Sequence, residues 1–352
     1  MVAAKDQHLF QRSFLKNGDC IIELNININY QPRFKPNSRF FITGGTGFIG
    51  TWLIDALMKL NDAFSLGCHF TVLTRDPAAF TNKFPQFSES SSLTFLKGDV
   101  SKVSFGDEYY DYLVHGAAVS SVWDKSENYL ETIVMGTMNV MKWARRIKIE
   151  KILFLSSGAV YGENPTEIDR FSETNLSAPQ LGAQGSVYGE SKRCAEMMVH
   201  MFGEAYSDVT IARLFSFYGP LMPKDNHFAF SQFMARAVKH EDIVIKNPNA
   251  CRSYLYIEDT VQSLIKLLKK NNEYMVYNIG GEAPVILGEL AQTIIKVTNS
   301  SSKIIFQSNK DKPPARSIYV PNVSRFHNEF EIKDKTSINE GIKLTEPWFR
   351  SL

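Results

Sequence analysis

Cysteine is scarce in this chain of 352 residues, which has only four, far apart and without a CxxC pair. This scarcity excludes a small disulfide-stapled scaffold and predicts reduced, mostly structural thiols in a reducing compartment. We therefore expect a cytoplasmic protein, and nothing in the sequence indicates a metal site.

Long hydrophobic runs are also missing. A helix that spans a bilayer needs ~20 predominantly apolar residues, and the apolar runs of this chain are shorter. Residues 1–20 carry five charged side chains where a signal peptide would have its apolar centre. The sequence thus predicts no membrane partner.

Neither sign of charge is in large excess. Lys and Arg together number 39 and Asp and Glu 37, for a net charge of +2, and no dense basic run occurs. Nucleic-acid-binding proteins usually carry a clustered basic footprint, so this class is excluded.

The chain is 44% hydrophobic and 22% charged, an ordinary globular balance, and its length fits one large domain or two modest ones.

Residues 1–36 look like an N-terminal extension. Four apolar residues alternate there with polar ones, a pattern typical of a strand with one apolar face; they are Leu24, Ile26, Ile28 and Tyr30. That face needs a cover, which could be the main domain, a partner subunit or another strand.

From Ser38 onward, short apolar strands alternate with helices. The expected strands are Arg39–Thr43, Phe70–Thr74, Leu93–Lys97, Tyr112–His115, Lys151–Ser156 and Val209–Leu214. The expected helices are Thr51–Leu60, Thr132–Ile147 and Tyr188–Tyr206. This alternation predicts an α/β fold with a doubly wound parallel sheet, covered by helices on both faces. We expect the sheet domain over residues 37–219 and a smaller C-terminal α/β lobe over 220–352, with some segments crossing between them.

A glycine-rich turn joins the first expected strand to the first helix. Residues 43–50 read TGGTGFIG, with Gly44, Gly47 and Gly50 in the spacing GxxGxxG. Such a turn lets a pyrophosphate approach the backbone at the positive end of the helix. The loop residues expected to contact a dinucleotide are Gly44, Thr46, Gly47, Phe48, Ile49 and Gly50. The alternative is a glycine-rich turn without a ligand.

The end of the second strand bears on the choice between NAD and NADP. An acidic residue there accepts from the ribose 2′-hydroxyl of NAD, whereas an Arg favours the 2′-phosphate of NADP. Thr74 stands where the acid is expected and Arg75 follows it, which favours NADP. In the alternative, Arg75 is a solvated surface charge and Asp76 turns inward to hold NAD.

Two further strand ends carry candidate cofactor contacts. After the third strand, Asp99 could reach the adenine amine or cap a turn, and Val100 follows it. After the fourth strand, the small residues Ala117 and Ala118 let the backbone pass close under a flat ligand. We interpret His115, at the end of that strand, as a structural residue.

Three residues form a candidate catalytic set. Tyr188 and Lys192 are four apart, on one face of the expected helix, and Ser157 follows the fifth strand. Tyrosine has a pKa of ~10, and lowering this pKa by ~3 units corresponds to ~4 kcal/mol. A nearby ammonium and a nicotinamide cation both favour the phenolate and so lower the pKa. Tyr188 could then remove a hydroxyl proton while hydride passes to the cofactor. The alternative is a structural tyrosine beside a lysine that extends to solvent.

The motifs TGGTGFIG, GDV, HGAA, SSGAVYG and YGESK occur here in one order. In that order they resemble the extended short-chain dehydrogenases/reductases, the NAD(P)-dependent nucleotide-sugar epimerase/dehydratase family. The resemblance covers roughly residues 38–345. It implies a Rossmann domain, a C-terminal nucleotide-sugar lobe and a homodimer. It also implies a catalytic triad of Ser157, Tyr188 and Lys192, in which Lys192 holds the nicotinamide ribose.

The resemblance also implies residues that bind a nucleotide-diphosphate sugar. Arg252 matches an Arg that binds the diphosphate, and Arg316 is the nearest candidate for a second one, with imperfect spacing. Ser216 stands where the family has an Asn, so one substrate or cofactor hydrogen bond differs. The family's usual Asn before the Gly-Thr of the fourth helix is also missing, since residues 132–137 read TIVMGT.

Gly158 and Ala159 follow the candidate catalytic Ser157. The resemblance implies Asp-Glu at these places in 4,6-dehydratases and a Glu in decarboxylases, so their absence favours a 4-epimerase or a keto-sugar reductase. Glu190 and Cys194 on the Tyr188 helix, or Glu173 and His227 from loops, could supply the missing acid and base of a dehydratase. A non-catalytic dinucleotide-sensing protein is a further alternative, although such relatives typically lose the Tyr–Lys pair.

Overall fold

The computed structural model describes residues 34–119, 126–163, 168–183, 185–203, 207–223, 228–307, 317–330 and 335–351. The expected strand of the N-terminal extension, His227 and Arg316 lie outside these residues. Among the helices that are described, none is long and apolar enough to cross a membrane.

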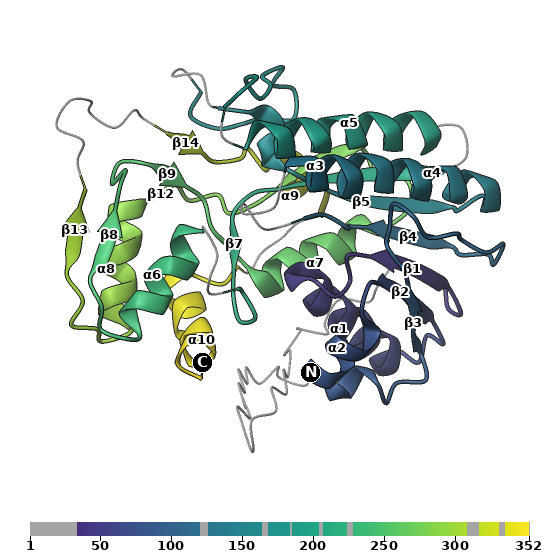
Figure 1. The fold of residues 1–352 in the computed structure, drawn as a ribbon, viewed down its shortest axis with the longest axis horizontal. Coiled ribbons are helices and arrows are strands. Elements are labelled where there is room, and N and C mark those ends of the chain that lie inside the picture. Colours follow the sequence, from purple (N-terminus) through teal and green to yellow (C-terminus); the bar gives the residue numbers. More distant parts are fainter. Residues whose placement is uncertain are drawn as a thin grey trace, which may run out of the picture.

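A seven-stranded parallel sheet is the centre of the larger domain (Figure 1). Its strands are β1 (Arg39–Thr43), β2 (His69–Thr74), β3 (Leu93–Lys97), β4 (Tyr112–His115), β5 (Lys151–Ser157), β6 (Asp208–Leu214) and β11 (Val276–Ile279). Their order across the sheet is β11-β6-β5-β4-β1-β2-β3. The predicted doubly wound α/β fold is therefore confirmed.

The strands are apolar on both faces because helices cover both. In β1, Phe40 and Ile42 belong to one core, whereas Phe41 belongs to the other and meets Trp143 with ring centroids 4.6 Å apart. Alternate strand residues point to opposite faces, so one short run of apolar residues contributes to both cores.

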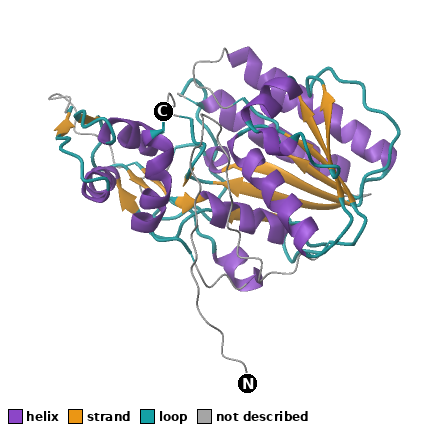
Figure 2. Ribbon diagram, turned by 90° about the horizontal axis from the view of Figure 1, so that it is seen from below, coloured by secondary structure: helices purple, strands orange, loops and turns teal. Residues whose placement is uncertain are grey.

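Helices α1 (Phe48–Ala63) and α7 (Ile257–Leu267) pack together against one face of the sheet. Helices α4 (Gly136–Ile147) and α5 (Ser186–Gly203) pack together against the other. Figure 2, seen from below, shows the strands between these layers. The short helices α2 (Pro77–Lys83) and η1 (Pro85–Phe87) follow β2.

The helix expected at Thr132–Ile147 begins earlier and is not uniform. It opens with α3 (Ser126–Tyr129), continues as the π-helix η2 (Leu130–Met135) and becomes regular in α4. π-Helical turns are rare and occur frequently at functional sites. Here the turn follows Tyr129, whose ring meets that of Tyr188 edge to face at 5.8 Å.

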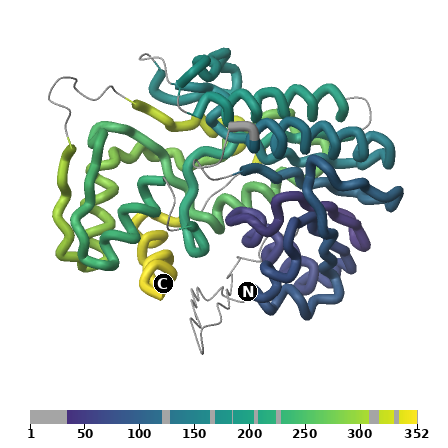
Figure 3. Tube along the Cα trace, in the orientation of Figure 1, coloured from purple at the N-terminus to yellow at the C-terminus, as the bar shows by residue number. Residues whose placement is uncertain are grey.

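The smaller lobe lies beside the larger domain, on the left of the trace in Figure 3. Its helices are α6 (Ala229–Ala237), α8 (Leu287–Val297) and α10 (Ile338–Arg350). Its short strands are β8 (Ile243–Ile245) with β13 (Ile304–Phe306), and β12 (Val285–Ile286) with β9 (Cys251–Arg252) and β14 (Ile318–Tyr319).

Three elements connect the two parts. Strands β7 (Phe217–Tyr218) and β10 (Leu255–Tyr256) pair in parallel, and helix α9 (Ser324–Phe330) packs on β11. Both α7 and β11 come from residues 220–352 yet join the larger domain, where β11 forms the edge strand next to β6. The chain thus crosses repeatedly between the two parts.

Candidate active site

The glycine-rich turn forms a tight backbone loop between β1 and α1. Gly44 has φ +73°, a left-handed conformation that favours glycine. A Cβ on it would come within 2.5 Å of the Gly116 backbone. Gly47 is the N-cap of α1, and its N–H donates to the Gly44 carbonyl at 3.1 Å. The turn is therefore tight and lies at the N-terminus of α1, the kind of position at which proteins bind phosphate groups.

The other predicted loop residues surround this turn. Thr46 is partly buried, and its hydroxyl contacts that of Thr74 at 3.1 Å. Phe48 packs against Phe217 of the connecting strand β7, with centroids 5.8 Å apart. Ile49 is partly buried against the core, and Gly50 is buried in the first turn of α1.

At the end of β2, the side chains of Arg75 and Asp76 have different roles. Arg75 is exposed, whereas Asp76 caps α2 by accepting a hydrogen bond from the Ala79 N–H at 3.0 Å. An Asp76 turned inward toward a ribose, the alternative considered above, is not what the structure shows. Thr74 is buried, so this strand end carries no inward-facing carboxylate.

Asp99 lies at the end of β3, near Arg75. Its carboxylate accepts hydrogen bonds from the Ser101 N–H at 2.9 Å and hydroxyl at 2.6 Å. Burial raises the pKa of Asp99, but these hydrogen bonds and the charges of Lys102 and Arg75 outweigh it, so the net shift is downward. Asp99 therefore caps the local turn. Val100, by contrast, is buried in the core.

His115 is buried between two threonines. The Thr43 hydroxyl accepts from the Gly116 and Ala117 N–H groups at 3.2 and 3.1 Å. The proton of the Thr43 hydroxyl is therefore available to His115 Nδ1, 2.7 Å away. The other ring nitrogen, His115 Nε2, then donates to the Thr137 hydroxyl at 2.9 Å. Burial lowers the pKa of His115 to about 3. These contacts give it a structural role and hold the backbone on which Ala117 and the exposed Ala118 lie.

The structure brings Ser157 and Tyr188 together at the carboxyl end of β5. The Ser157 Oγ accepts from the Ala159 N–H at 3.1 Å. Burial raises the pKa of Tyr188, while a hydrogen bond with Ser157 acts in the opposite direction. Burial therefore dominates the pKa of Tyr188 in this structure, and Lys192 is engaged elsewhere. The lowered pKa expected beside both Lys192 and a nicotinamide cation stays a prediction.

Lys192 lies one turn beyond Tyr188 on α5 and is buried. Its ammonium donates to the Leu155 carbonyl at 2.7 Å and lies 4.9 Å from the centre of the Phe154 ring. Burial lowers the pKa of Lys192 to about 8, and the Glu196 carboxylate opposes this shift. The amine is thus fixed under the end of β5.

A buried ion pair that was not predicted from the sequence supports this helix. Arg213 binds Glu196 through two hydrogen bonds of 2.9 and 2.7 Å, and Ser156 donates to Glu196 at 2.6 Å. Arg213 also donates to Tyr161, which donates to Asn278 at 2.8 Å. The available signal was the position of Glu196, four residues after Lys192 on the same helix face.

The predicted substrate residues lie where the smaller lobe meets the larger domain. Arg252 donates to the Ser317 carbonyl at 3.0 Å and to its hydroxyl at 3.1 Å. Its guanidinium also lies 5.9 Å from the centre of the Tyr319 ring. Ser216 is partly buried, and its carbonyl accepts from the Leu255 N–H at 3.0 Å.

The groups considered as a replacement acid and base point elsewhere. Glu173 accepts from the Asn278 N–H at 2.9 Å. Glu190 is exposed and pairs with Arg193 at 3.6 Å, and Cys194 is exposed. These three side chains are therefore not positioned at Ser157.

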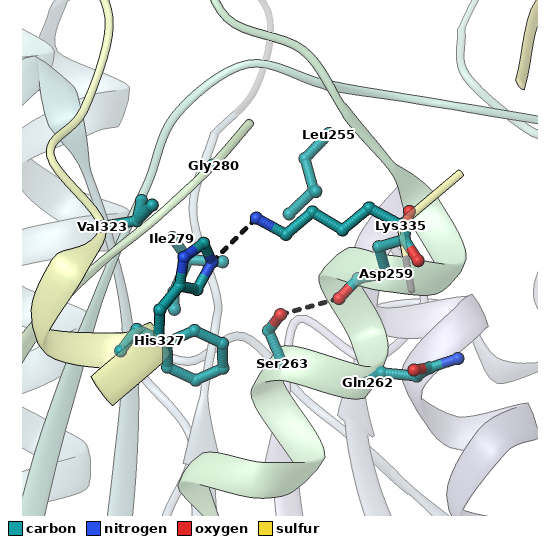
Figure 4. A pocket seen from close by; sticks show the side chains of 10 residues that line it. Leu255, Asp259, Gln262, Ser263, Ile279, Gly280, Val323, His327 and Lys335 are labelled. Carbon is teal, nitrogen blue, oxygen red and sulfur yellow. Dashed lines mark hydrogen bonds between the residues drawn. The ribbon is translucent and has the colours of Figure 1, made fainter. Parts of the chain in front are cut away.

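A separate pocket lies between α7, α9 and the end of β11 (Figure 4). His327 and Lys335 point toward each other there, with Lys335 donating to His327 Nε2 at 2.7 Å. Glu282 contacts His327 Nδ1 at 2.9 Å and Lys335 at 3.1 Å. Because these groups bind one another, and the Ser157–Tyr188 pair lies outside this pocket, we assign the pocket no chemistry.

Known proteins resemble this chain over most of its length. One curated relative, UDP-glucuronic acid decarboxylase 3 from Arabidopsis thaliana, is 29% identical over 327 residues, covering 90% of each chain. A solved UDP-glucuronic acid 4-epimerase from Bacillus cereus, in complex with UDP-glucuronic acid and NAD, is 23% identical. It has a TM-score of 0.75 and covers 89% of this chain and 99% of that one.

A UDP-glucose 4-epimerase from Thermotoga maritima, solved with UDP-glucose, shares the fold at 21% identity and a TM-score of 0.75, with coverage of 89% of this chain and 99% of that one. A family model also matches residues 40–280, from β1 to just beyond β11. The match includes the glycine-rich turn, Ser157, Tyr188 and Lys192. This chain therefore belongs to the NAD dependent epimerase/dehydratase family.

Proposed function

We propose that this chain is a nucleotide-sugar 4-epimerase that acts by hydride transfer at the sugar ring. One observation carries the proposal: Ser157 and Tyr188 meet at the end of β5, with Lys192 one turn away, while Gly158 and Ala159 offer no acid or base. These groups suit proton and hydride transfer at one hydroxyl-bearing carbon.

Each residue has a distinct part in the proposed reaction. The turn at Gly44 and Gly47 would hold the dinucleotide, whose oxidised nicotinamide accepts hydride and favours a phenolate nearby. Tyr188 then removes the proton of the C4 hydroxyl, and Ser157 hydrogen-bonds that oxygen. Lys192, whose pKa burial has already lowered to about 8, would bind the nicotinamide ribose.

The names of the relatives include decarboxylases as well as epimerases. Loss of carbon dioxide or of water needs further groups that protonate or deprotonate the sugar carbons. Gly158 and Ala159 cannot supply them, and Glu173, Glu190 and Cys194 are turned elsewhere. This favours a reaction that keeps every heavy atom of the sugar.

Product masses test this proposal directly. A panel of nucleotide hexoses and uronic acids, headed by the UDP sugars, is incubated with the enzyme and NAD, and the products are read by mass spectrometry and chromatography. We expect a product isobaric with its substrate but with a different retention time. A clean loss of water or of carbon dioxide would contradict the proposal.

The second candidate is a keto-sugar reductase that uses NADPH. It is favoured by the exposed Arg75 at the end of β2, where Thr74 replaces a carboxylate and Asp76 is occupied as a helix cap. In that case 4-keto sugars would give products two mass units heavier than their substrates.

Arg75 provides a test of cofactor choice. Replacing Arg75 with alanine should weaken NADP binding and leave NAD binding nearly unchanged, because only NADP carries the 2′-phosphate. A charge-assisted hydrogen bond is worth about 1.5–3 kcal/mol, so the loss should be roughly ten- to a hundredfold. Titration of both cofactors by calorimetry measures it, and equal losses for both would assign Arg75 another role.

We propose that the substrate's diphosphate binds Arg252, with Arg316 as the second cation. The guanidinium of Arg252 offers a planar set of donors that suits phosphate oxygens. The contacts with Ser317 hold this group at the junction of the lobes, beside Tyr319. Ser216 would line the same junction from the segment after β6.

We also propose a homodimer. Four large apolar side chains are more than half exposed on the neighbouring elements η2 and α5, namely Leu130, Met135, Met197 and Met201. Exposed large apolar side chains on neighbouring elements are candidates for a protein–protein contact, and a second copy of the chain would cover them. Light scattering should give twice the chain mass for the parent protein. The double variant Met197→Lys with Met201→Lys should have half that mass. A monomeric parent protein would contradict the proposal.

A further inference from the structure

Two hydrogen bonds join the end of β5 to α5. Lys192 on the helix donates to the Leu155 carbonyl at 2.7 Å, and the Ser156 hydroxyl on the strand donates to Glu196 at 2.6 Å. Lys192 and Glu196 lie one turn apart on one face of α5. Two successive strand residues are thus bonded to two successive turns of the helix, which opposes both sliding and rotation of α5 relative to the strand.

The Glu196 carboxylate rests on two neighbouring strands. Ser156 of β5 and Arg213 of β6 are direct partners in the register of the sheet. Both donate to Glu196 Oε1, and Arg213 also donates to Oε2 at 2.7 Å. Ser156 and Glu196 are only 3% and 8% exposed, so water has little access to the bond between them. A buried, charge-assisted bond of this length is among the stronger hydrogen bonds of a protein.

The residues that this bond holds lead directly to the candidate catalytic groups. Ser157 follows Ser156, and its Oγ accepts from the Ala159 N–H at 3.1 Å. A Cβ on Gly189, the residue after Tyr188, would lie 2.6 Å from the Ala159 carbonyl. The first turn of α5 therefore passes directly against the segment that follows β5. A shift of the strand end relative to the helix would change how Ser157 meets Tyr188.

We propose that Ser156 is a positioning residue: its hydrogen bond to Glu196 fixes the end of β5 against α5 and thereby sets the position of Ser157 relative to Tyr188. Ser156 acts through these neighbours, because its own hydroxyl is buried and bound to Glu196. Misplacing a reacting group by about 1 Å can cost about a hundredfold in rate. The catalytic consequence rests on the proposed function, whereas the fixed strand end does not.

The variant Ser156→Ala tests the fixed strand end, because it removes one hydroxyl and leaves the bonds between Arg213 and Glu196 in place. The measurement is amide hydrogen exchange, read by mass spectrometry on a peptide that spans residues 155–161. We expect exchange there to become about three- to tenfold faster, the equivalent of one buried hydrogen bond.

Steady-state kinetics of the same variant test the positioning role. We expect kcat to fall by roughly tenfold while KM changes little, because the change alters the geometry of the reacting groups and removes no contact with the substrate. Ser156→Thr keeps a hydroxyl at this position and should restore both kcat and the slow exchange. A loss of packing alone would not be reversed by returning the hydroxyl.

Ser191→Ala is the matched control. Ser191 is also a buried serine, 1% exposed, and its hydroxyl donates at 2.6 Å to the Val187 carbonyl within α5. Because that bond does not reach β5, the control should leave kcat and the exchange of residues 155–161 close to those of the parent protein.

The outcomes separate the proposal from the function on which it rests. Unchanged exchange in Ser156→Ala, or equal effects of Ser156→Ala and Ser191→Ala, would overturn the fixed strand end. Faster exchange with unchanged kcat would overturn the positioning role. Faster exchange in a protein whose parent form converts no nucleotide sugar would support the fixed strand end and count only against the proposed function.

Discussion

Replacing Tyr188 with phenylalanine should lower the turnover of a nucleotide sugar by about 10²–10⁴-fold, the usual contribution of general acid–base catalysis. The ring remains, and with it the edge-to-face contact with Tyr129 at 5.8 Å. Only the hydroxyl that meets Ser157 is lost. The melting temperature and the NAD affinity should therefore stay close to those of the parent protein. On one preparation, steady-state kinetics measure the turnover, a cofactor titration measures the NAD affinity and a thermal melt measures the melting temperature.

The neighbouring ring offers a control for this prediction. Tyr129→Phe removes a hydroxyl whose proximity raises the pKa of Tyr188, so it should retain turnover within about tenfold. Near-normal activity in Tyr188→Phe would refute its role as the base. Equal losses in the two variants would instead indicate a packing effect on this part of α5.

Replacing Glu196 with glutamine should lower the free energy of unfolding by about 3–5 kcal/mol, the cost of leaving a buried charge without its partner. Arg213 is only 14% exposed, and two hydrogen bonds of 2.9 and 2.7 Å hold it to Glu196. Urea denaturation measures the change. Because the Glu196 carboxylate raises the pKa of Lys192, the variant should also lower that pKa further.

A double variant separates the ion pair from the packing. Glu196→Met together with Arg213→Met removes both charges, so no uncompensated charge stays buried, and it should be more stable than Glu196→Gln alone. If the double variant instead lost as much stability as the two single changes combined, the unpaired charge would not be the cause of the lost stability in Glu196→Gln.

Local pattern was enough to place most of the sheet. The strands predicted at Arg39–Thr43, Leu93–Lys97 and Tyr112–His115 have the same bounds in the structure. Short runs that are apolar throughout are typical of strands with both faces buried, as in a parallel sheet covered by helices, so much of each strand's environment follows from its own residues. The family also follows from local motifs, because a phosphate-binding turn needs its glycines at a fixed, short spacing within a few residues.

Helix detail depended on contacts that local pattern does not contain. The expected helix at Thr132–Ile147 is preceded by α3 and interrupted by the π-helix η2. This π-helical turn lies beside Tyr129, whose ring meets that of Tyr188 on another helix, so its conformation depends on packing around the site.

The sequence by itself determined six of the seven strands of the sheet, the glycine-rich turn and the helix that presents Tyr188 and Lys192, because each depends on residues close together in the chain. Only the tertiary structure decided that Tyr319 fills the space beside Gly158 and that Arg213 pairs with Glu196. These contacts join residues from different elements, and their geometry depends on strand register and helix packing across the whole fold. For the same reason the ammonium of Lys192 is held by the Leu155 carbonyl, a partner that the spacing of its own helix could not indicate.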